Sequence, residues 1–213
     1  KIFKKRGIRI MAGSGVQGID VDNGKATVRV MRDSEDSLIE CDKVLVAVGV
    51  QGNIENIGLE IVGIETERNF ITVDDNMLTN VEGIYAIGDV TGKMLLAHVA
   101  SAQGVTAVES LAGLNPPKLD YGLMPRAIYC QPQVASFGLT ETQAVDQGYD
   151  VKIGQFPMMA SGKALALGET DGMAKLVIDS EVGEILGAHM LGPEVTELLG
   201  ELAITRMLEG TTA

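Results

Sequence analysis

The stretch Thr79-Asn-Val-Glu-Gly-Ile-Tyr-Ala-Ile-Gly-Asp89 decides the fold of this chain. Its apolar run, Ile84–Ile87, predicts a buried strand that ends at Gly88 and Asp89. A carboxylate just beyond a strand of an open α/β sheet is placed to accept hydrogen bonds from the hydroxyls of a sugar or polyol. Asp89 could instead cap the helix that follows, and both interpretations remain open here.

A helix is predicted after this stretch, beginning near Leu95 and Leu96 and ending at Gly113, a residue type that favours helix C-termini. Its apolar residues recur at helical spacing: Leu95, Val99, Ala102, Val105, Val108 and Leu111. The start of such a helix presents free N–H groups and a partial positive charge, which suit a phosphate or an electron-rich ring edge.

The N-terminal part contains Gly13-Ser-Gly-Val-Gln-Gly18, which matches the dinucleotide pattern G-x-G-x-x-G. That pattern binds a pyrophosphate only where a helix begins at the third glycine. Here Val16–Val21 and Ala26–Met31 alternate in polarity around Asn23-Gly24, which is typical of a β-hairpin. We therefore expect a loop and a strand at Gly13–Gly18, not a dinucleotide loop.

Two further apolar runs, Ile8–Ala12 and Val44–Val48, predict strands, the second buried on both faces because it is unbroken and β-branched. Gly49 follows the second run. A glycine there lets a cofactor approach the backbone, although a simple turn glycine fits equally well.

The remainder predicts an α+β domain after the linker Asn115-Pro-Pro117. Thr140 and Gln143 form a capping-box pattern at the start of a helix. Strands are expected around Tyr149–Ile153, Met173–Ile178 and Ile185–Leu191, followed by a helix from Pro193. That helix carries one apolar stripe: Val195, Leu198, Leu199 and Leu202.

Composition excludes several function classes. The 17 basic and 29 acidic residues give a net charge of −12, which disfavours nucleic acid. No apolar run is long enough for a membrane span, and the two isolated cysteines, Cys41 and Cys130, indicate a cytoplasmic protein. His98 and His189 lack a nearby partner of catalytic type and are expected to be packed and hydrogen-bonded.

The Thr79–Asp89 stretch is similar to the second flavin-binding motif of the pyridine-nucleotide–disulfide oxidoreductases. Leu96-Ala97-His98, with Gly104 after it, resembles the dihydrolipoamide dehydrogenase branch of that family. Val134–Glu141 and Ile185–Pro193 resemble its dimerisation domain. The resemblance implies an α/β fold with the end of an NAD-binding domain at 1–52, the returning part of an FAD-binding domain at 53–118 and a dimerisation domain at 119–213.

The resemblance also implies residue roles. Asp89 would bind the ribitol of FAD. The helix start would lie beside the flavin pyrimidine edge through Leu95, Leu96, Ala97 and His98. Val16 and Gly49 would contact NAD.

An enzyme of this branch passes electrons from dihydrolipoamide through a cysteine pair and FAD to NAD. It acts as a homodimer and associates with the lipoyl-bearing acyltransferase of a 2-oxo acid dehydrogenase complex. By this resemblance the cysteine pair would lie upstream of Lys1 and the catalytic histidine beyond Ala213, so no catalytic residue is expected in this chain. Two departures from the pattern are Val50-Gln51-Gly52, where relatives carry an arginine, and Leu95, where methionine is usual.

Two alternatives come from other function classes. The chain could belong to another member of the family with a different substrate, which the residues around the cysteine pair would decide. It could also act as a non-enzymatic dimerisation module.

Overall fold

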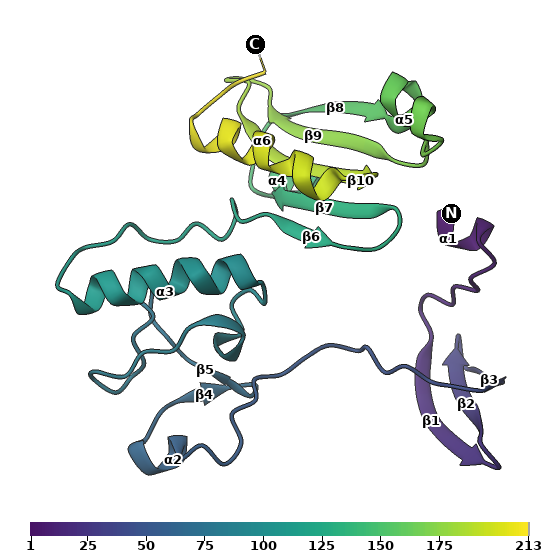
Figure 1. The fold of residues 1–213 in the computed structure, drawn as a ribbon, viewed down its shortest axis with the longest axis horizontal. Helices are drawn as coiled ribbons and strands as arrows, with labels where there is room; N and C mark the ends of the chain where they lie inside the picture. Colours follow the sequence, from purple (N-terminus) through teal and green to yellow (C-terminus); the bar gives the residue numbers. More distant parts are fainter. Residues whose placement is uncertain (213) are drawn as a thin grey trace. The chain divides into compact units, whose positions relative to one another are not determined.

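A computed structural model describes residues 1–212 (Figure 1). The chain divides into two compact units, Lys1–Val50 and the part from Gln51 onward. The first unit opens with a single helical turn, α1 (Ile2–Lys5).

Three antiparallel strands form the first unit: β1 (Gly15–Asp22), β2 (Lys25–Arg32) and β3 (Glu35–Cys41), in that order across the sheet. The turn between β1 and β2 has positive φ at Asn23 (48°) and Gly24 (78°). The hairpin predicted from the Asn-Gly pair is thereby confirmed, because a turn of this type needs positive φ at both central residues.

Two predicted strands of this unit are wrong. Ile8–Ala12 and Val44–Val48 are irregular, and the side chains of Leu45 and Val48 are 91% and 93% exposed. A strand buried on both faces needs hydrogen-bonding neighbours and covering helices. No described residue pairs with either segment as a strand, so their apolar character alone does not make them β-structure.

The second unit begins with short elements that carry a longer helix: α2 (Leu59–Val62), β4 (Thr66–Glu67), β5 (Phe70–Ile71), the 3₁₀ turn η1 (Gly88–Thr91) and α3 (Ala97–Leu111). The predicted helix is confirmed as α3. Val99 and Ala107 are buried on it, whereas Val105, Val108 and Leu111 are exposed. Only one side of its apolar pattern is therefore covered among residues 1–212.

Ile84–Ile87 does not form the predicted strand. A single antiparallel bridge joins Leu78 to Tyr85, and the Ala86 amide donates to the carbonyl of Met77 over 3.0 Å. Met77 is fully buried beneath this turn-like pairing. The segment is thus held by local hydrogen bonds, and no described strand extends it into a sheet.

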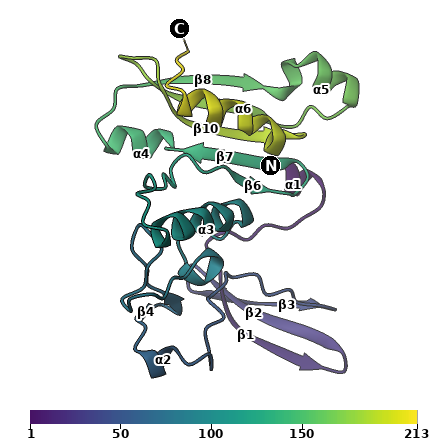
Figure 2. The same ribbon diagram turned by 60° about the vertical axis from the view of Figure 1, so that its left-hand side comes forward.

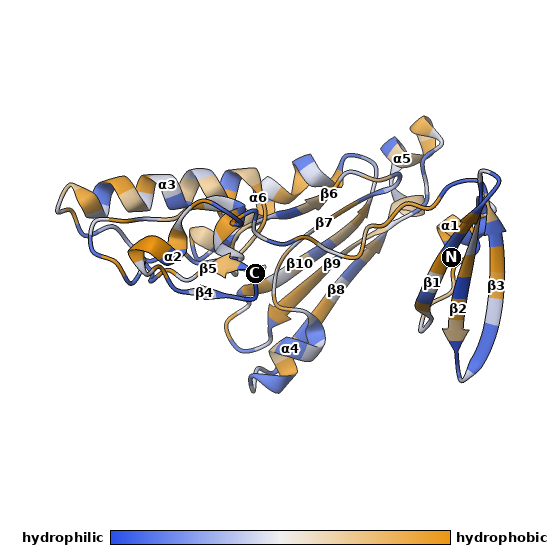
Figure 3. Ribbon diagram, turned by 90° about the horizontal axis from the view of Figure 1, so that it is seen from below, coloured by the Kyte–Doolittle hydropathy of each residue, from blue (hydrophilic) through white to orange (hydrophobic). Residues whose placement is uncertain are grey.

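The C-terminal part is a five-stranded antiparallel sheet with the order β6-β7-β10-β9-β8 (Figures 1 and 2). Its strands are β6 (Arg126–Ile128), β7 (Gln133–Gly138), β8 (Val151–Pro157), β9 (Met173–Asp179) and β10 (Ile185–Gly192). The three strands predicted after Tyr149 are confirmed. Apolar residues dominate β10, which is buried along most of its length (Figure 3).

Helical segments accompany this sheet: α4 (Glu141–Asp146), the 3₁₀ turn η2 (Met158–Ala160), α5 (Gly162–Leu167) and α6 (Val195–Met207). The capping box of Thr140 and Gln143 is present at α4 as predicted. α6 packs on β7 and β10, where Val195 and Leu199 join Phe137 in the main core. Leu198, expected on the same stripe, is instead 45% exposed and borders the space between α6 and α5.

The backbones of two strand ends approach closely at Gly138 and Gly187, which are paired in register. A Cβ atom on Gly138 would collide with the carbonyl of Leu186, and one on Gly187 with the carbonyl of Leu139. The Leu139 amide donates to the Leu186 carbonyl over 2.9 Å at this place. The join between β7 and β10 therefore requires glycine on both sides.

Among the helices of residues 1–212, none has both the length and the apolar character needed to cross a bilayer.

Candidate functional site

The candidate site is the turn at Gly88-Asp89 beside the start of α3. Gly88 has a φ of +76°, and a Cβ atom there would lie 3.3 Å from that of Ala100. The turn therefore lies directly on α3. Asp89 follows with an exposed carboxylate.

The backbone of Gly88 is fixed at both ends. Its N–H donates to Oε1 of Gln103 over 2.6 Å, and its carbonyl accepts the hydroxyl of Thr91 over 2.8 Å. Both side chains are buried. The backbone conformation that places Asp89 is consequently fixed by buried hydrogen bonds to Gly88.

The start of α3 is open. Leu96 is the N-cap residue in an extended conformation, and no side chain caps the helix. Asp89 therefore does not cap α3, which removes one of the two interpretations of this residue. Amides at an uncapped N-terminus keep their partial positive charge for an incoming electron-rich group.

The four predicted residues at this helix start differ in exposure. Leu95 and Leu96 are half-buried, while Ala97 and His98 are exposed. The structure thus brings the five FAD candidates to two neighbouring segments, the Asp89 turn and the first turn of α3.

Both histidines are hydrogen-bonded, as predicted, but His98 is exposed and so is not packed as expected, whereas His189 is half-buried. Nε2 of His98 lies 2.9 Å from the carbonyl of Pro125, and Nε2 of His189 lies 3.0 Å from the carbonyl of Leu139. A carbonyl accepts only, so Nε2 carries the proton in each case. No group of residues within 1–212 has the composition and spacing of a metal site.

The two NAD candidates lie in the first unit. Val16 is an exposed residue of β1, and Gly49 lies in the irregular segment after β3 with a φ of +128°. No hydrogen bond recorded among the described residues joins them. The hexapeptide Gly13–Gly18 runs into β1, so no helix begins at Gly18, and the prediction of a loop and strand is confirmed.

Three residues of the site were missed by sequence reasoning: Thr91, Gln103 and Tyr121. Nε2 of Gln103 donates to the Tyr121 hydroxyl over 3.0 Å. Gln103 lies four residues after Val99, on the same helix face. A carboxamide on a buried face needs partners, and that signal could have singled it out.

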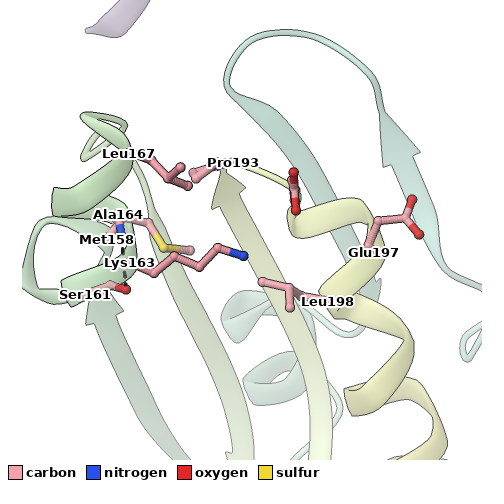
Figure 4. Close-up of a pocket in the computed structure, with 9 residues that line it drawn as sticks. Met158, Ser161, Lys163, Ala164, Leu167, Pro193, Glu197 and Leu198 are labelled. Carbon is pink, nitrogen blue, oxygen red and sulfur yellow. Dashed lines mark hydrogen bonds between the residues drawn. The ribbon is translucent and has the colours of Figure 1, made fainter.

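A separate pocket lies in the C-terminal part, between α5 and the start of α6 (Figure 4). Apolar side chains such as Met158, Leu167 and Leu198 line it, with Lys163 and Glu197 also at the pocket. None of the predicted site residues contributes to it.

An aspartate after a tight glycine turn, with an uncapped helix start beside it, suits a dinucleotide cofactor, and the antiparallel sheet adds an α+β part to this site. Residues 1–104 match the family of pyridine nucleotide-disulphide oxidoreductases, and residues 124–213 match the dimerisation domain of the same family. The chain belongs to this family.

Curated relatives carry a more specific name. The chain is 50% identical over 208 residues to the dihydrolipoyl dehydrogenase of Mycobacterium leprae, which covers 97% of this chain and 44% of the relative. It is 47% identical over 213 residues to that of Rhizobium etli, covering 99% of this chain and 44% of the relative. The chain thus spans less than half the length of these relatives.

Solved structures share the fold. LpdA from Mycobacterium tuberculosis matches with a TM-score of 0.89 at 24% identity, covering 99% of this chain and 45% of that one.

Proposed function

We propose that this chain is part of an FAD-dependent oxidoreductase that passes electrons from dihydrolipoamide, through a redox disulfide and the flavin, to NAD. The observation that carries the proposal is the Gly88-Asp89 turn beside the open start of α3. The dihydrolipoyl dehydrogenases that align over nearly all of this chain support the substrate.

The residues of the turn fit FAD. The Asp89 carboxylate is exposed and is not used as a helix cap, so it is available to accept hydrogen bonds from ribitol hydroxyls. The amides at the start of α3, around Leu95, Leu96, Ala97 and His98, suit the electron-rich pyrimidine edge of the flavin. FAD, when bound, supplies the two-electron redox chemistry that no side chain of this chain provides.

His98 has a positional role in this proposal. Its Nε2–H donates to the carbonyl of Pro125, so the imidazole ties the start of α3 to the segment that leads into β6. The backbone of His98, and not its ring, is then the part that faces the flavin.

Val16 and Gly49 are proposed to contact NAD. Nothing lies within 4 Å of the position that a Cβ atom on Gly49 would occupy, so the backbone there is open to a ligand. An exposed Val16 offers an apolar surface in the same unit.

The proposed organisation follows the family. Residues 1–52 would end the NAD-binding domain, 53–118 would return into the FAD-binding domain, and 119–213 would form the dimerisation domain of a homodimer. The lipoyl-bearing acyltransferase of a 2-oxo acid dehydrogenase complex is the proposed partner of the whole enzyme.

Free thiols at Cys41 and Cys130 support a cytoplasmic location.

The test is the reaction of the full-length enzyme. It should be purified with bound FAD and should form NADH from dihydrolipoamide and NAD. Loss of NADH formation on mutation of its cysteine pair would support the proposed electron path. A preparation that instead reduces another disulfide with a reduced pyridine nucleotide, and is inactive with dihydrolipoamide, would place the chain with a different member of the family.

A further inference from the structure

Gln103 is a fully buried carboxamide in the middle of α3. Burying such a group costs free energy unless both of its ends are hydrogen-bonded. Here both ends are satisfied, by the Gly88 amide at Oε1 and by the Tyr121 hydroxyl at Nε2. The Gly88 N–H can only donate, so the oxygen of Gln103 must face it and the orientation of the amide is fixed.

The contact with Gly88 joins two packing constraints. Gly88 lies against Ala100, and Ile87 lies against Gly104. A Cβ atom added to Gly104 would be 3.4 Å from Cδ1 of Ile87. Gln103 stands between these positions on the helix. The turn that carries Asp89 is therefore held on one face of α3 by the 2.6 Å hydrogen bond between Gly88 and Gln103 and by the two packing contacts beside it.

The other end of Gln103 leads toward the C-terminal domain. Tyr121 is half-buried, and its ring centroid lies 5.9 Å from Nζ of Lys93. The next residue, Gly122, accepts a hydrogen bond at its carbonyl from the amide of Gly138 over 2.8 Å. Gly138 ends β7, so a short path of hydrogen bonds and chain neighbours connects the Asp89 turn to the five-stranded sheet.

We propose that Gln103 is a positioning residue for flavin binding, which sets the Gly88-Asp89 turn and, through Tyr121, ties it to the segment entering the dimerisation domain. The proposal rests on the role given above to Asp89. Gln103 does not touch the flavin; its effect passes through the backbone of Gly88.

The test compares four variants: Gln103→Leu, Gln103→Glu, Tyr121→Phe and, as a matched control, Ser101→Ala. Ser101 is an exposed residue of the same helix whose hydroxyl bonds only the local carbonyl of Ala97. Leucine removes both hydrogen bonds and leaves the Gly88 amide unpaired. Glutamate restores an acceptor for Gly88, and the Tyr121 hydroxyl can donate to it, so it is the rescue variant.

The first readout is hydrogen exchange of the Gly88 amide in the 213-residue chain. Gln103→Leu should accelerate exchange at Gly88 at least tenfold, because one unpaired buried donor costs on the order of the 1.4 kcal/mol that equals a factor of ten. Ser101→Ala and Gln103→Glu should leave this exchange within about threefold of the parent chain.

The second readout is the FAD dissociation constant of the full-length enzyme, measured by flavin fluorescence with Asp89→Ala alongside. Gln103→Leu should raise it about tenfold, Tyr121→Phe by a smaller factor, and Gln103→Glu should return it toward the parent value. If Gln103→Leu fails to fold, the FAD dissociation constants of Gln103→Glu and Tyr121→Phe still test the positioning role of Gln103.

The outcomes separate the two ideas. If Asp89→Ala weakens FAD binding but Gln103→Leu does not, the positioning role is wrong and the function of Asp89 stands. If Asp89→Ala leaves FAD binding unchanged, the ribitol role is wrong and the positioning role falls with it. Unchanged exchange at Gly88 in Gln103→Leu would overturn the hydrogen bond itself.

Discussion

Nζ of Lys118 lies 2.7 Å from Oδ2 of Asp75, and this ion pair fastens the Pro-Pro linker to the turn before Met77. The hydrogen bond and charge of Lys118 lower the pKa of Asp75 below its usual 3.8, and Asp75 raises the pKa of Lys118. Because the folded-state pKa of Asp75 lies below 3.8, the ion pair stabilises the folded chain above about pH 3.8. That stabilisation is lost as the pH falls through the folded-state pKa of Asp75.

The first prediction tests this pair. Lys118→Met should raise the pKa of Asp75 back toward 3.8 in a carboxyl-carbon NMR titration, because both the donor and the positive charge are removed. Lys152→Met, a change at another exposed lysine, is the control and should leave Asp75 unaffected. Identical titrations in the parent chain and Lys118→Met would contradict the ion pair.

The second prediction concerns Asp89. In the full-length enzyme, Asp89→Ala should raise the FAD dissociation constant at least tenfold, since a charged acceptor of hydroxyl donors is lost. His98→Ala should change it by about threefold or less, because the ring bonds Pro125 and not the proposed ligand. Equal losses in the two variants, measured by flavin release, would remove the ribitol role.

The third prediction is that the 213-residue chain forms no NADH from dihydrolipoamide. Its two cysteines, Cys41 and Cys130, are free thiols that are distant in sequence, so it offers no vicinal pair to accept electrons. The full-length enzyme serves as the positive control in the same absorbance assay. NADH formation by pure chain of verified mass would refute the prediction.

The fourth prediction separates stability from NAD binding at Gly13–Gly18. Gly13 has a φ of +71°, so Gly13→Ala should lower the free energy of unfolding by about 1 kcal/mol. Gly18→Thr lies in β1 and tests the third glycine of the pattern. Neither change should alter the NAD dissociation constant of the full-length enzyme by more than about twofold. A selective loss of NAD affinity at unchanged stability would show that this segment binds the dinucleotide.

The fifth prediction concerns assembly through the end of α6. Ile204, Met207 and Leu208 are exposed there, and Arg206 pairs with Glu184, which holds the helix end in place. A symmetric homodimer would bury such a patch on both copies. Sedimentation should show a dimer at micromolar concentration that Leu208→Glu weakens by at least tenfold, the effect of placing a charge in an apolar contact.

Val182→Glu is the matched control, because Val182 is also an exposed apolar residue, in the turn between β9 and β10. It should leave the dimer intact. A compact monomer at high concentration, unaffected by Leu208→Glu, would defeat the prediction.

Local patterns predicted the elements whose partners are close in sequence. Asn23-Gly24 determines its own turn, Thr140 and Gln143 cap the same helix, and β9 and β10 are joined by a short turn. In each case, the interacting groups lie within the predicted segment, so composition and spacing contain the answer.

The failures share one physical cause. Val44–Val48 and Ile84–Ile87 carry strand-like composition, but a central strand exists only through neighbours that a local pattern does not specify. The site shows the same division: the motif around Asp89 could be read from the sequence, whereas the sequence could at most mark Gln103 as a buried polar group and could not name its partner, which lies fifteen positions away.

The paired glycines at Gly138 and Gly187 have a genetic consequence. Every missense change of a glycine codon adds at least a methyl group, and at both positions that group meets a backbone carbonyl that cannot rotate away. A saturation mutagenesis library selected for folded protein should therefore lose every non-glycine allele at these two codons. It should retain many substitutions at the exposed turn around Val182. Depletion at both codons would locate the join between β7 and β10 without any structural measurement.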